Sequence, residues 1–240
     1  MSLLNFSNNE INSDKSLEEL RYLSNLRTLN IAGNKNICTI QPRIMKPLRN
    51  LQAIIASDIG VQDVSFLNCL PNLNTAILSR NSLCVFNADR ITSLTKLSLG
   101  HNQFEVMPDF SSLVGLIELR MNNNLCESIP ETLLNNKKLK ILDVSHNRLA
   151  SWDHVKLLAR LHCLTNLSLK ANPLPSPPDE ATMELQEDIS SDKLQDPEEI
   201  KYRHKVLTLF QSKVGAAQKL KVQVTLFTVA VYLNLSSHSH

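Results

Sequence analysis

Two histidines occupy the same place in two similar segments, and they are the first residues whose type could support chemistry. His101 lies in GHNQF and His146 lies in SHNRL. If each segment follows a strand, the two backbones lie two strands, or about 10 Å, apart. A shared metal ion would need Asn123 as a third ligand, and this arrangement favours ordinary surface histidines over a metal site.

Charged residues also recur at matching places, and the chemistry that they predict is recognition. Lys96, Glu118, Arg120 and Asp143 alternate in sign along successive segments, so they can pair with one another or with a charged partner. The sequence contains no nucleophile elbow, phosphate-binding loop, metal-ligand spacing or kinase signature. We therefore predict a non-enzymatic protein with no cofactor and no metal.

A sequence repeat must position these side chains. Residues 139–149 read LKILDVSHNRL, which matches L-x-x-L-x-L-x-x-N-x-L, the leucine-rich-repeat template. Eight copies follow one another at intervals of 21 to 25 residues, inside the range of this repeat class. They begin at Met1, Leu26, Leu51, Leu73, Leu94, Leu116, Leu139 and Leu164.

The template positions are filled almost without exception. Positions 1, 4, 6 and 11 give 32 slots, of which 31 hold an apolar residue, against about 13 expected from a chain that is 42% hydrophobic. The miss is Asn36, followed by Ile37, which predicts a one-residue bulge. Position 9 holds Ile59 in the third copy, which predicts an irregular junction there. In the other copies it holds Asn9, Asn34, Asn81, Asn102, Asn124, Asn147 and Asn172.

The pattern predicts an α/β solenoid, a right-handed curved leucine-rich-repeat array. Each copy should form a short strand over positions 3 to 7, so that a parallel sheet lines the concave face. Helix, 3₁₀ turns and coil should mix on the convex face, with proline-containing extended turns at 107–110 and 128–134 and a helix within 152–164. A second apolar column should line the convex wall: Val64, Phe86, Met107, Ile129 and Trp152.

The concave sheet is where function is expected, because its outward side chains are free to vary without loss of the fold. Ile55 and Ile77 are adjacent apolar residues there and form a candidate hot spot, although strand propensity is an alternative explanation. For the charged residues, mutual cross-strand pairing is the alternative. The predicted partner-binding residues are Ile55, Ile77, Arg80, Lys96, His101, Glu118, Arg120, Asp143, His146 and Lys170.

Composition narrows the classes of partner and compartment. The net charge of +2 argues against nucleic acid or an anionic membrane as the partner. The five cysteines are scattered, with no C-x-x-C pair, and the amino terminus lacks a basic leader followed by a long apolar block. The expected setting is therefore cytoplasmic, with the nucleus as an alternative, and the expected partner is another protein.

Four segments divide the chain. Residues 1–174 hold the eight repeats, and 175–199 form an acidic, proline-rich loop with nine acidic residues against one lysine over 179–199. We expect residues 200–226 to form a capping helix followed by a candidate strand. One face of this helix should carry Tyr202, Val206, Leu209 and Phe210. Residues 227–240 form an atypical tail. At the other end nothing precedes Met1 to cover the first strand, so self-association through this edge is a further expectation.

The last copy, LSLKANPL, followed by YRHKVLTLF, resembles an intracellular leucine-rich-repeat family. That family includes the repeat-type regulatory subunit of protein phosphatase one and the axonemal outer-arm dynein light chain. The resemblance covers residues 1–210 and implies a phosphatase-regulatory or a dynein-associated role.

Two classes of function remain open. The first is a non-enzymatic protein-binding module or scaffold that uses its concave face. The second is the recognition part of a larger enzyme, such as a kinase, ligase or nuclease, whose catalytic part is absent; the uncovered start and the unfamiliar tail motivate it.

Overall fold

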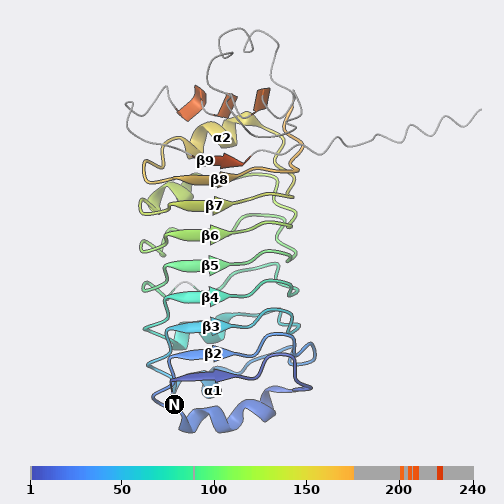
Figure 1. The fold of residues 1–240 in the computed structure, drawn as a ribbon, viewed down its shortest axis with the longest axis vertical. Helices are drawn as coiled ribbons and strands as arrows, with labels where there is room; N and C mark the ends of the chain where they lie inside the picture. Colours follow the sequence, from blue (N-terminus) through green and yellow to red (C-terminus); the bar gives the residue numbers. More distant parts are fainter. Residues whose placement is uncertain are drawn as a thin grey trace, which may run out of the picture.

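The computed structural model describes residues 2–88, 90–175, 201–202, 205–206, 208–210 and 221–223. The acidic loop beyond residue 175, the tail at 227–240 and Met1 lie outside the described residues. Figure 1 shows the strands stacked as rungs of one ladder, with the first strand at one end and β9 at the other.

One parallel sheet contains nine strands in sequence order. The strands are β1 (Leu3–Asn5), β2 (Thr28–Asn30), β3 (Ala53–Ile55), β4 (Thr75–Ile77), β5 (Lys96–Ser98), β6 (Glu118–Arg120), β7 (Ile141–Asp143), β8 (Asn166–Ser168) and β9 (Lys221–Gln223). From β1 to β8, neighbouring strands pair position 3 with 3, 4 with 4 and 5 with 5. The predicted solenoid of eight parallel rungs is therefore confirmed.

The opposite wall is a mixture of conformations, as predicted. It contains η1 (Asp14–Tyr22), α1 (Pro42–Met45), η2 (Ser65–Cys69), η3 (Glu131–Asn135) and α2 (Trp152–Leu158). The predicted extended turn at 128–134 is wrong in its second half, because Pro130 precedes η3 with a β-region backbone and supplies a fixed φ at the helix start. The helix expected within 152–164 begins as predicted, with the Ser151 side chain accepting the N–H of Asp153, but it ends at Leu158.

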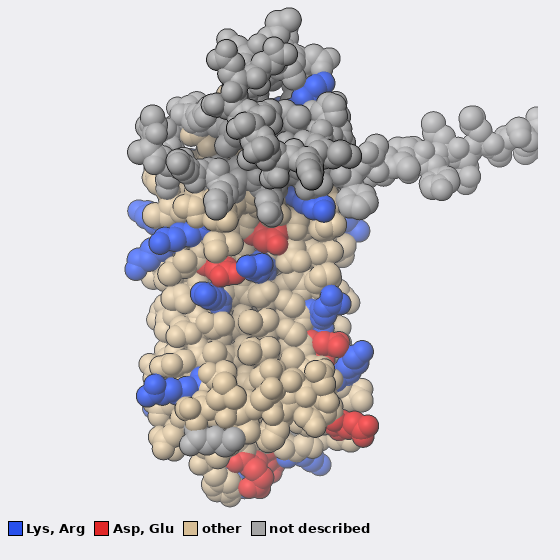
Figure 2. All heavy atoms as spheres, viewed as in Figure 1, with Lys and Arg blue, Asp and Glu red and all other residues tan. Residues whose placement is uncertain are grey.

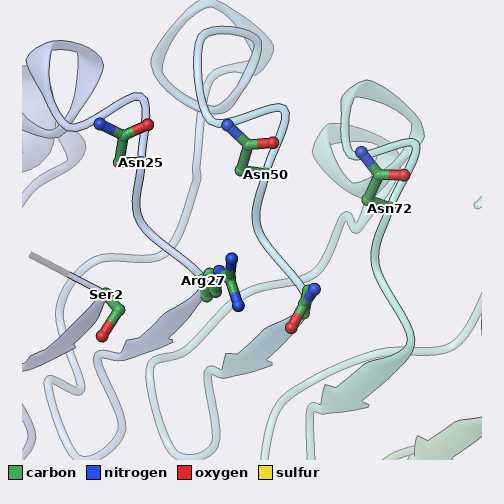
Figure 3. A pocket seen from close by; sticks show the side chains of 6 residues that line it. Ser2, Asn25, Arg27, Asn50 and Asn72 are labelled. Carbon is green, nitrogen blue, oxygen red and sulfur yellow. The ribbon is translucent and has the colours of Figure 1, made fainter.

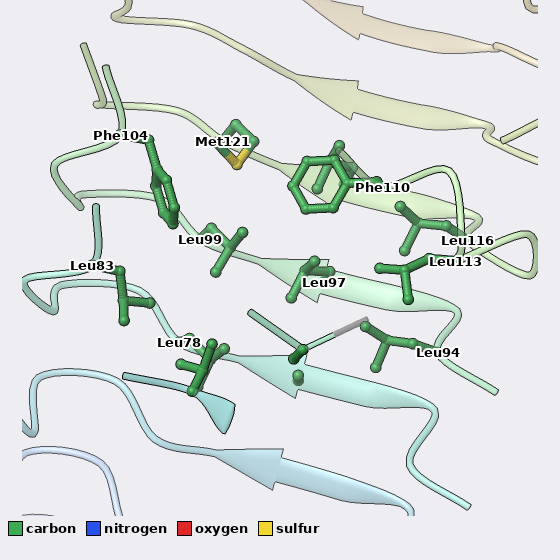
Figure 4. Packing of buried hydrophobic residues seen from close by; sticks show 14 of the residues in the cluster. Leu78, Leu83, Leu94, Leu97, Leu99, Phe104, Phe110, Leu113, Leu116 and Met121 are labelled. Atoms are coloured by element: carbon green, nitrogen blue, oxygen red, sulfur yellow. The ribbon is translucent and has the colours of Figure 1, made fainter. Parts of the chain in front are cut away.

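The core lies between the sheet and this wall. Figure 4 shows leucines from successive rungs, such as Leu78 and Leu99, in one packed layer with Phe104 and Phe110. In the predicted second column, Val64, Met107, Ile129 and Trp152 are buried. Phe86 is half-buried and packs edge-on against Phe110, with 5.6 Å between ring centroids.

The position-9 asparagines form a buried hydrogen-bond ladder. Asn102 donates its amide to the carbonyls of Leu99 (2.9 Å) and Leu78 (3.1 Å), and its Oδ1 accepts the N–H of Leu83 (3.1 Å). Equivalent bonds recur at Asn34, Asn81, Asn124, Asn147 and Asn172. Each asparagine therefore joins two rungs and satisfies backbone groups that the turn would otherwise leave without partners.

The junction around Ile59 is irregular, as predicted. Ile59 has no side-chain amide, and the turn of the preceding copy is rearranged: Cys38 has a φ of 57° and donates its N–H to the carbonyl of Ile59 at 3.0 Å. The next asparagine compensates from the other side, because Asn81 Oδ1 accepts the N–H groups of Ile59, Gly60 and Val61.

The two ends of the array differ from each other. At the carboxyl end, the helical residues Tyr202, Val206 and Phe210 are buried. Tyr202 lies 5.5 Å from Trp152, measured between ring centroids, and donates its hydroxyl to the carbonyl of Leu174 at 2.5 Å. At the other end, β1 is the edge strand of the described sheet, as expected, but its Leu4 is buried in the same core cluster as Leu17 and Leu20 of η1. Phe6 and Leu3 are exposed by 37% and 59%.

No helix among the described residues is long and apolar enough to cross a bilayer.

Candidate protein-binding face

Regular pairing of β1 to β8 turns the residues at positions 3 and 5 outward on a single surface, here called the sheet face. The residue between them, at position 4, is buried in every one of these strands. Neighbouring strands lie about 4.8 Å apart, so side chains at the same position in adjacent copies are in contact range. The sheet face therefore presents two columns of side chains that do not build the core.

Charged side chains gather on one part of the sheet face. Figure 2 shows them over β5 to β7, whereas the middle of the face over β2 to β4 carries none. Glu118 Oε1 accepts a hydrogen bond from Arg120 Nε at 2.7 Å, and its Oε2 lies 3.9 Å from Lys96 Nζ. The Glu118 side chain is only 17% exposed, whereas those of Lys96 and Arg120 are 60% and 50% exposed. Both cations therefore remain open to solvent while they interact with Glu118.

Asp143 departs from the expected alternation of cross-strand pairs. Its Oδ1 accepts the backbone N–H of Ser145 at 3.1 Å and the Ser145 hydroxyl at 2.7 Å. These local bonds form because a carboxylate can bond to the backbone two residues further on, where the chain turns after β7. Arg120, which faces Asp143 in register, pairs with Glu118 of its own strand instead.

The part of the sheet face over β3 and β4 is apolar and hydroxyl-rich. Ile55 and Ile77 are direct register partners, as the sequence predicted, and both are half-buried. Next to them, the hydroxyls of Ser79 and Ser98 form a hydrogen bond of 2.9 Å. The isoleucines are thus partly shielded by neighbours and still accessible from solvent.

Position 8 of every copy has a left-handed backbone and forms a turn edge along the carboxyl ends of the strands. The residues of this turn edge are Asn8, Gly33, Asp58, Arg80, His101, Asn123, His146 and Ala171. Backbone N–H groups of this edge extend the hydrogen bonding between neighbouring copies beyond the strands. The N–H of His101, for example, donates to the carbonyl of Asn122 at 2.8 Å. The conformation points these side chains away from the core, which is why Arg80 and the two histidines can lie there.

Arg80 and the imidazoles of His101 and His146 lie along the turn edge. Burial, and then the charges of Arg80 and His146, lower the pKa of His101 below its ordinary value. Lys170, at position 7, is half-buried, and its carbonyl accepts the N–H of His146 at 2.7 Å. No group of acidic, histidine or cysteine side chains within the described part of the chain could hold a metal ion.

A second rim runs along the amino-terminal ends of the strands, and the sequence reasoning missed it. Figure 3 shows Ser2, Asn25, Arg27, Asn50 and Asn72 around a polar groove there. Asn50 donates its amide to the carbonyl of Ser24, and Asn72 donates to that of Arg49. The signal was present in the sequence, because each of these asparagines directly precedes position 1 of its copy.

Two curated proteins share sequence with this chain, and no family model matches it. Podocan-like protein 1 of Mus musculus is 32% identical over 142 residues, which cover 56% of this chain and 24% of that protein. Receptor-like protein 7 of Arabidopsis thaliana is 33% identical over 155 residues, 62% of this chain and 15% of that protein. Both are leucine-rich-repeat proteins.

The chain has the leucine-rich-repeat fold. It spans less than a quarter of the length of these two relatives. The similarity between this chain and the two relatives supports the leucine-rich-repeat class. The resemblance to the phosphatase subunit and the dynein light chain stays a proposal.

Proposed function

We propose that this leucine-rich-repeat array is a protein-binding module that recognises its partner on the sheet face. The observation that carries the proposal is the separation of roles along each strand: position 4 is buried in all of β1 to β8, while positions 3 and 5 face outward. A rigid surface whose side chains are not needed for folding is suited to recognition.

Composition of the face indicates the kind of contact. Ile55 and Ile77 offer an apolar centre that association would bury, and burial of apolar area is the main driving force of protein–protein binding. Lys96, Glu118 and Arg120 lie on the strands beside it and supply charges that fix orientation and exclude wrong partners. The predicted partner surface is therefore an apolar patch bordered by at least one carboxylate.

The decisive experiment uses two single variants with matched controls. Proteins near the chain are first identified by proximity labelling in the native cell, and their recovery is then measured with Ile77→Asp and Arg120→Glu. We expect each variant to lose most of the recovery, because one places a carboxylate in the apolar centre and the other reverses a charge.

The controls are Val106→Asp and Arg90→Glu, which make the same changes outside the sheet face at exposed residues. Both should retain full recovery. Undiminished recovery of every partner by both sheet-face variants, with folding intact, would remove this face from consideration.

A phosphatase-regulatory or dynein-associated role is a finer proposal and rests on the resemblance of the last repeat and the following helix. It predicts that the captured proteins include the catalytic subunit of protein phosphatase one or an axonemal dynein chain. Recovery of neither, from cells that contain both, would contradict it while leaving the binding module intact.

Residence in a reducing compartment, the cytoplasm or the nucleus, is likewise a proposal. All five cysteines are free thiols in the structure, and Cys38, Cys84 and Cys163 are exposed. Exposed free thiols persist where glutathione keeps them reduced. Microscopy of the tagged protein at its native expression level tests this, and a location in the secretory pathway would contradict it.

A further inference from the structure

A groove on the rim of the array combines an apolar floor with a cationic border. It lies between the end of η3 and the turn after α2, at the amino-terminal ends of β7 and β8, and has a volume of about 740 Å³. It is lined by Leu134, Lys137, Ala159, Arg160, Leu161, His162 and Cys163. These residues are outside the sheet face, so the groove is a separate surface from the one proposed above.

The floor of the groove is apolar. Ala159 and Leu161 are buried, and Leu134 is half-buried and packs against the core. The turns on either side are held by backbone hydrogen bonds from Leu139 to Asn136 and from Leu164 to Leu161, both of 3.0 Å. The groove is thus preformed by the repeat framework, which reduces the conformational cost of binding.

Its border is positively charged on both sides. Lys137 and Arg160 are exposed, and His162 occupies the place in its copy that Lys137 holds in the preceding one, one rung away. Lys138 and Lys140 extend the charge along the start of β7. No carboxylate lines the groove among the described residues, and no ion pair joins Lys137 or Arg160 to another described residue.

The fold does not require these cations. The backbone N–H of Arg160 closes the turn after α2 by donating to the carbonyl of Leu157, and any residue other than proline could supply that bond. Cations that border a groove without an internal counter-charge repel one another and are relieved by an acidic ligand. Charge complementarity therefore identifies the occupant's chemistry.

We infer that this rim groove is a second binding site and takes an acidic peptide segment of a protein partner. Carboxylates of the peptide pair with Lys137 and Arg160, and an aliphatic side chain between them packs on the accessible surface of Leu134 and Cys163, above the buried Ala159 and Leu161. A single-stranded nucleic acid fits less well, because no phenylalanine, tyrosine or tryptophan among the described residues lines the groove as a stacking platform for a base. The apolar floor likewise favours a peptide over a bare phosphate.

The test titrates the whole chain with a fluorescein-labelled peptide of glutamates around one central leucine, read by fluorescence anisotropy. The double variant Lys137→Glu with Arg160→Glu should bind at least about tenfold more weakly, which corresponds to about 1.4 kcal/mol. Added salt should weaken wild-type binding, because the pairs are partly exposed. A peptide with glutamine in place of every glutamate should not bind measurably.

Arg49→Glu is the matched control, because Arg49 is exposed and occupies the same template place as Lys137, four copies earlier. It should bind the peptide as the wild type does. The sheet-face variant Ile77→Asp should also bind normally, so failure of the sheet-face proposal leaves this one testable. Equal binding by the wild type and the double variant, no binding by the wild type, or tighter binding of single-stranded DNA or anionic vesicles through the same two cations would overturn the inference.

Discussion

The two halves of this array share one backbone and present different chemistry. Over β2 to β4 the sheet face is uncharged and centred on Ile55 and Ile77, and the groove on the rim beside it is lined by amide side chains together with Arg27. Over β5 to β8 the sheet face carries Lys96, Glu118 and Arg120, and the rim beside it is lined by cations. The strands pair in the same register in both halves.

The contrast shows that the residues that build the core and those that face solvent vary independently along the chain. Positions 1, 4, 6, 9 and 11 repeat the same residue types in both halves, while positions 2, 3, 5 and 8 change freely. The fold therefore constrains the surface only in where it places side chains. The two halves should therefore be energetically alike in their framework and functionally different in their surface.

The largest expected effect is on the framework leucines. Leu29→Ala and Leu119→Ala each remove a fully buried side chain at position 4, one in each half. Each should lower the free energy of unfolding by about 2–5 kcal/mol, because the cavity is only partly refilled. Urea unfolding followed by circular dichroism measures this, and a loss below about 1 kcal/mol in either half would break the equivalence.

The asparagine ladder should give the next largest effect. Asn102→Ala removes four hydrogen bonds to buried backbone groups, at a cost of at least about 1–3 kcal/mol. Asn9→Ala is the matched control, because Asn9 is exposed and, among the described residues, bonds only to the carbonyls of Phe6 and Ser7 within its own turn. Equal losses of stability in the two variants would show that the ladder does not bind the rungs together.

Opposite substitutions at two equivalent places on the turn edge should change the free energy of unfolding in opposite directions. Ala171 has a φ of 53°, and Ala171→Gly should raise the free energy of unfolding by up to about 1 kcal/mol, because glycine adopts this conformation without strain. Gly33 holds the equivalent place in the other half, and a Cβ there would clash with the side chain of Asn8. Gly33→Ala should therefore be destabilising in the same urea assay, and a neutral result for both would contradict the strain argument.

The surface ion pairs should contribute least to stability. Glu118→Gln removes the partner of both Lys96 and Arg120 and should cost less than about 1 kcal/mol, with a smaller loss in high salt. A loss of several kcal/mol in the free energy of unfolding would show that these charges stabilise the fold, and would contradict their assignment to partner recognition.

The stability of the turn edge should depend on pH. The folded environment lowers the pKa of His101 through burial and the charges of Arg80 and His146, so folding favours its neutral form. Its contribution to stability is present above the pKa of an unfolded histidine and declines as the pH falls below it. Arg80→Gln should raise the pKa of His101 in an NMR titration, and an unchanged midpoint would contradict the electrostatic cause.

Much of the framework could be predicted from the sequence because the template fixes it residue by residue. The strands, the asparagine ladder, the irregular turn at Ile59 and the buried column through Trp152 all follow from spacing alone. The covering of Leu4 could not be predicted, because η1 lies in a segment between template positions and its Leu17 and Leu20 follow no repeated pattern. The same reason explains the missed 3₁₀ helix after Pro130.

The candidate site was predicted in position but not in pairing. The register placed Ile55 beside Ile77 and Glu118 beside Lys96, as the template implies. Asp143 bonds with Ser145, and Arg120 bonds with Glu118. These pairings depend on side-chain rotamers, which the spacing of residues in the sequence does not determine. The cationic groove was missed because Lys137 and Arg160 lie in turns that the template leaves unassigned.

Hydroxyl-radical footprinting of the chain with its captured partner bound tests the central claim most directly, because it reports the exposure of individual side chains. If the partner binds on the sheet face, Ile55 and Ile77 should be protected on binding, while Val85 and Val106, which are exposed and lie outside the sheet face, should be oxidised as in the free protein. Protection of Val85 and Val106 with unchanged oxidation of the two isoleucines would contradict it.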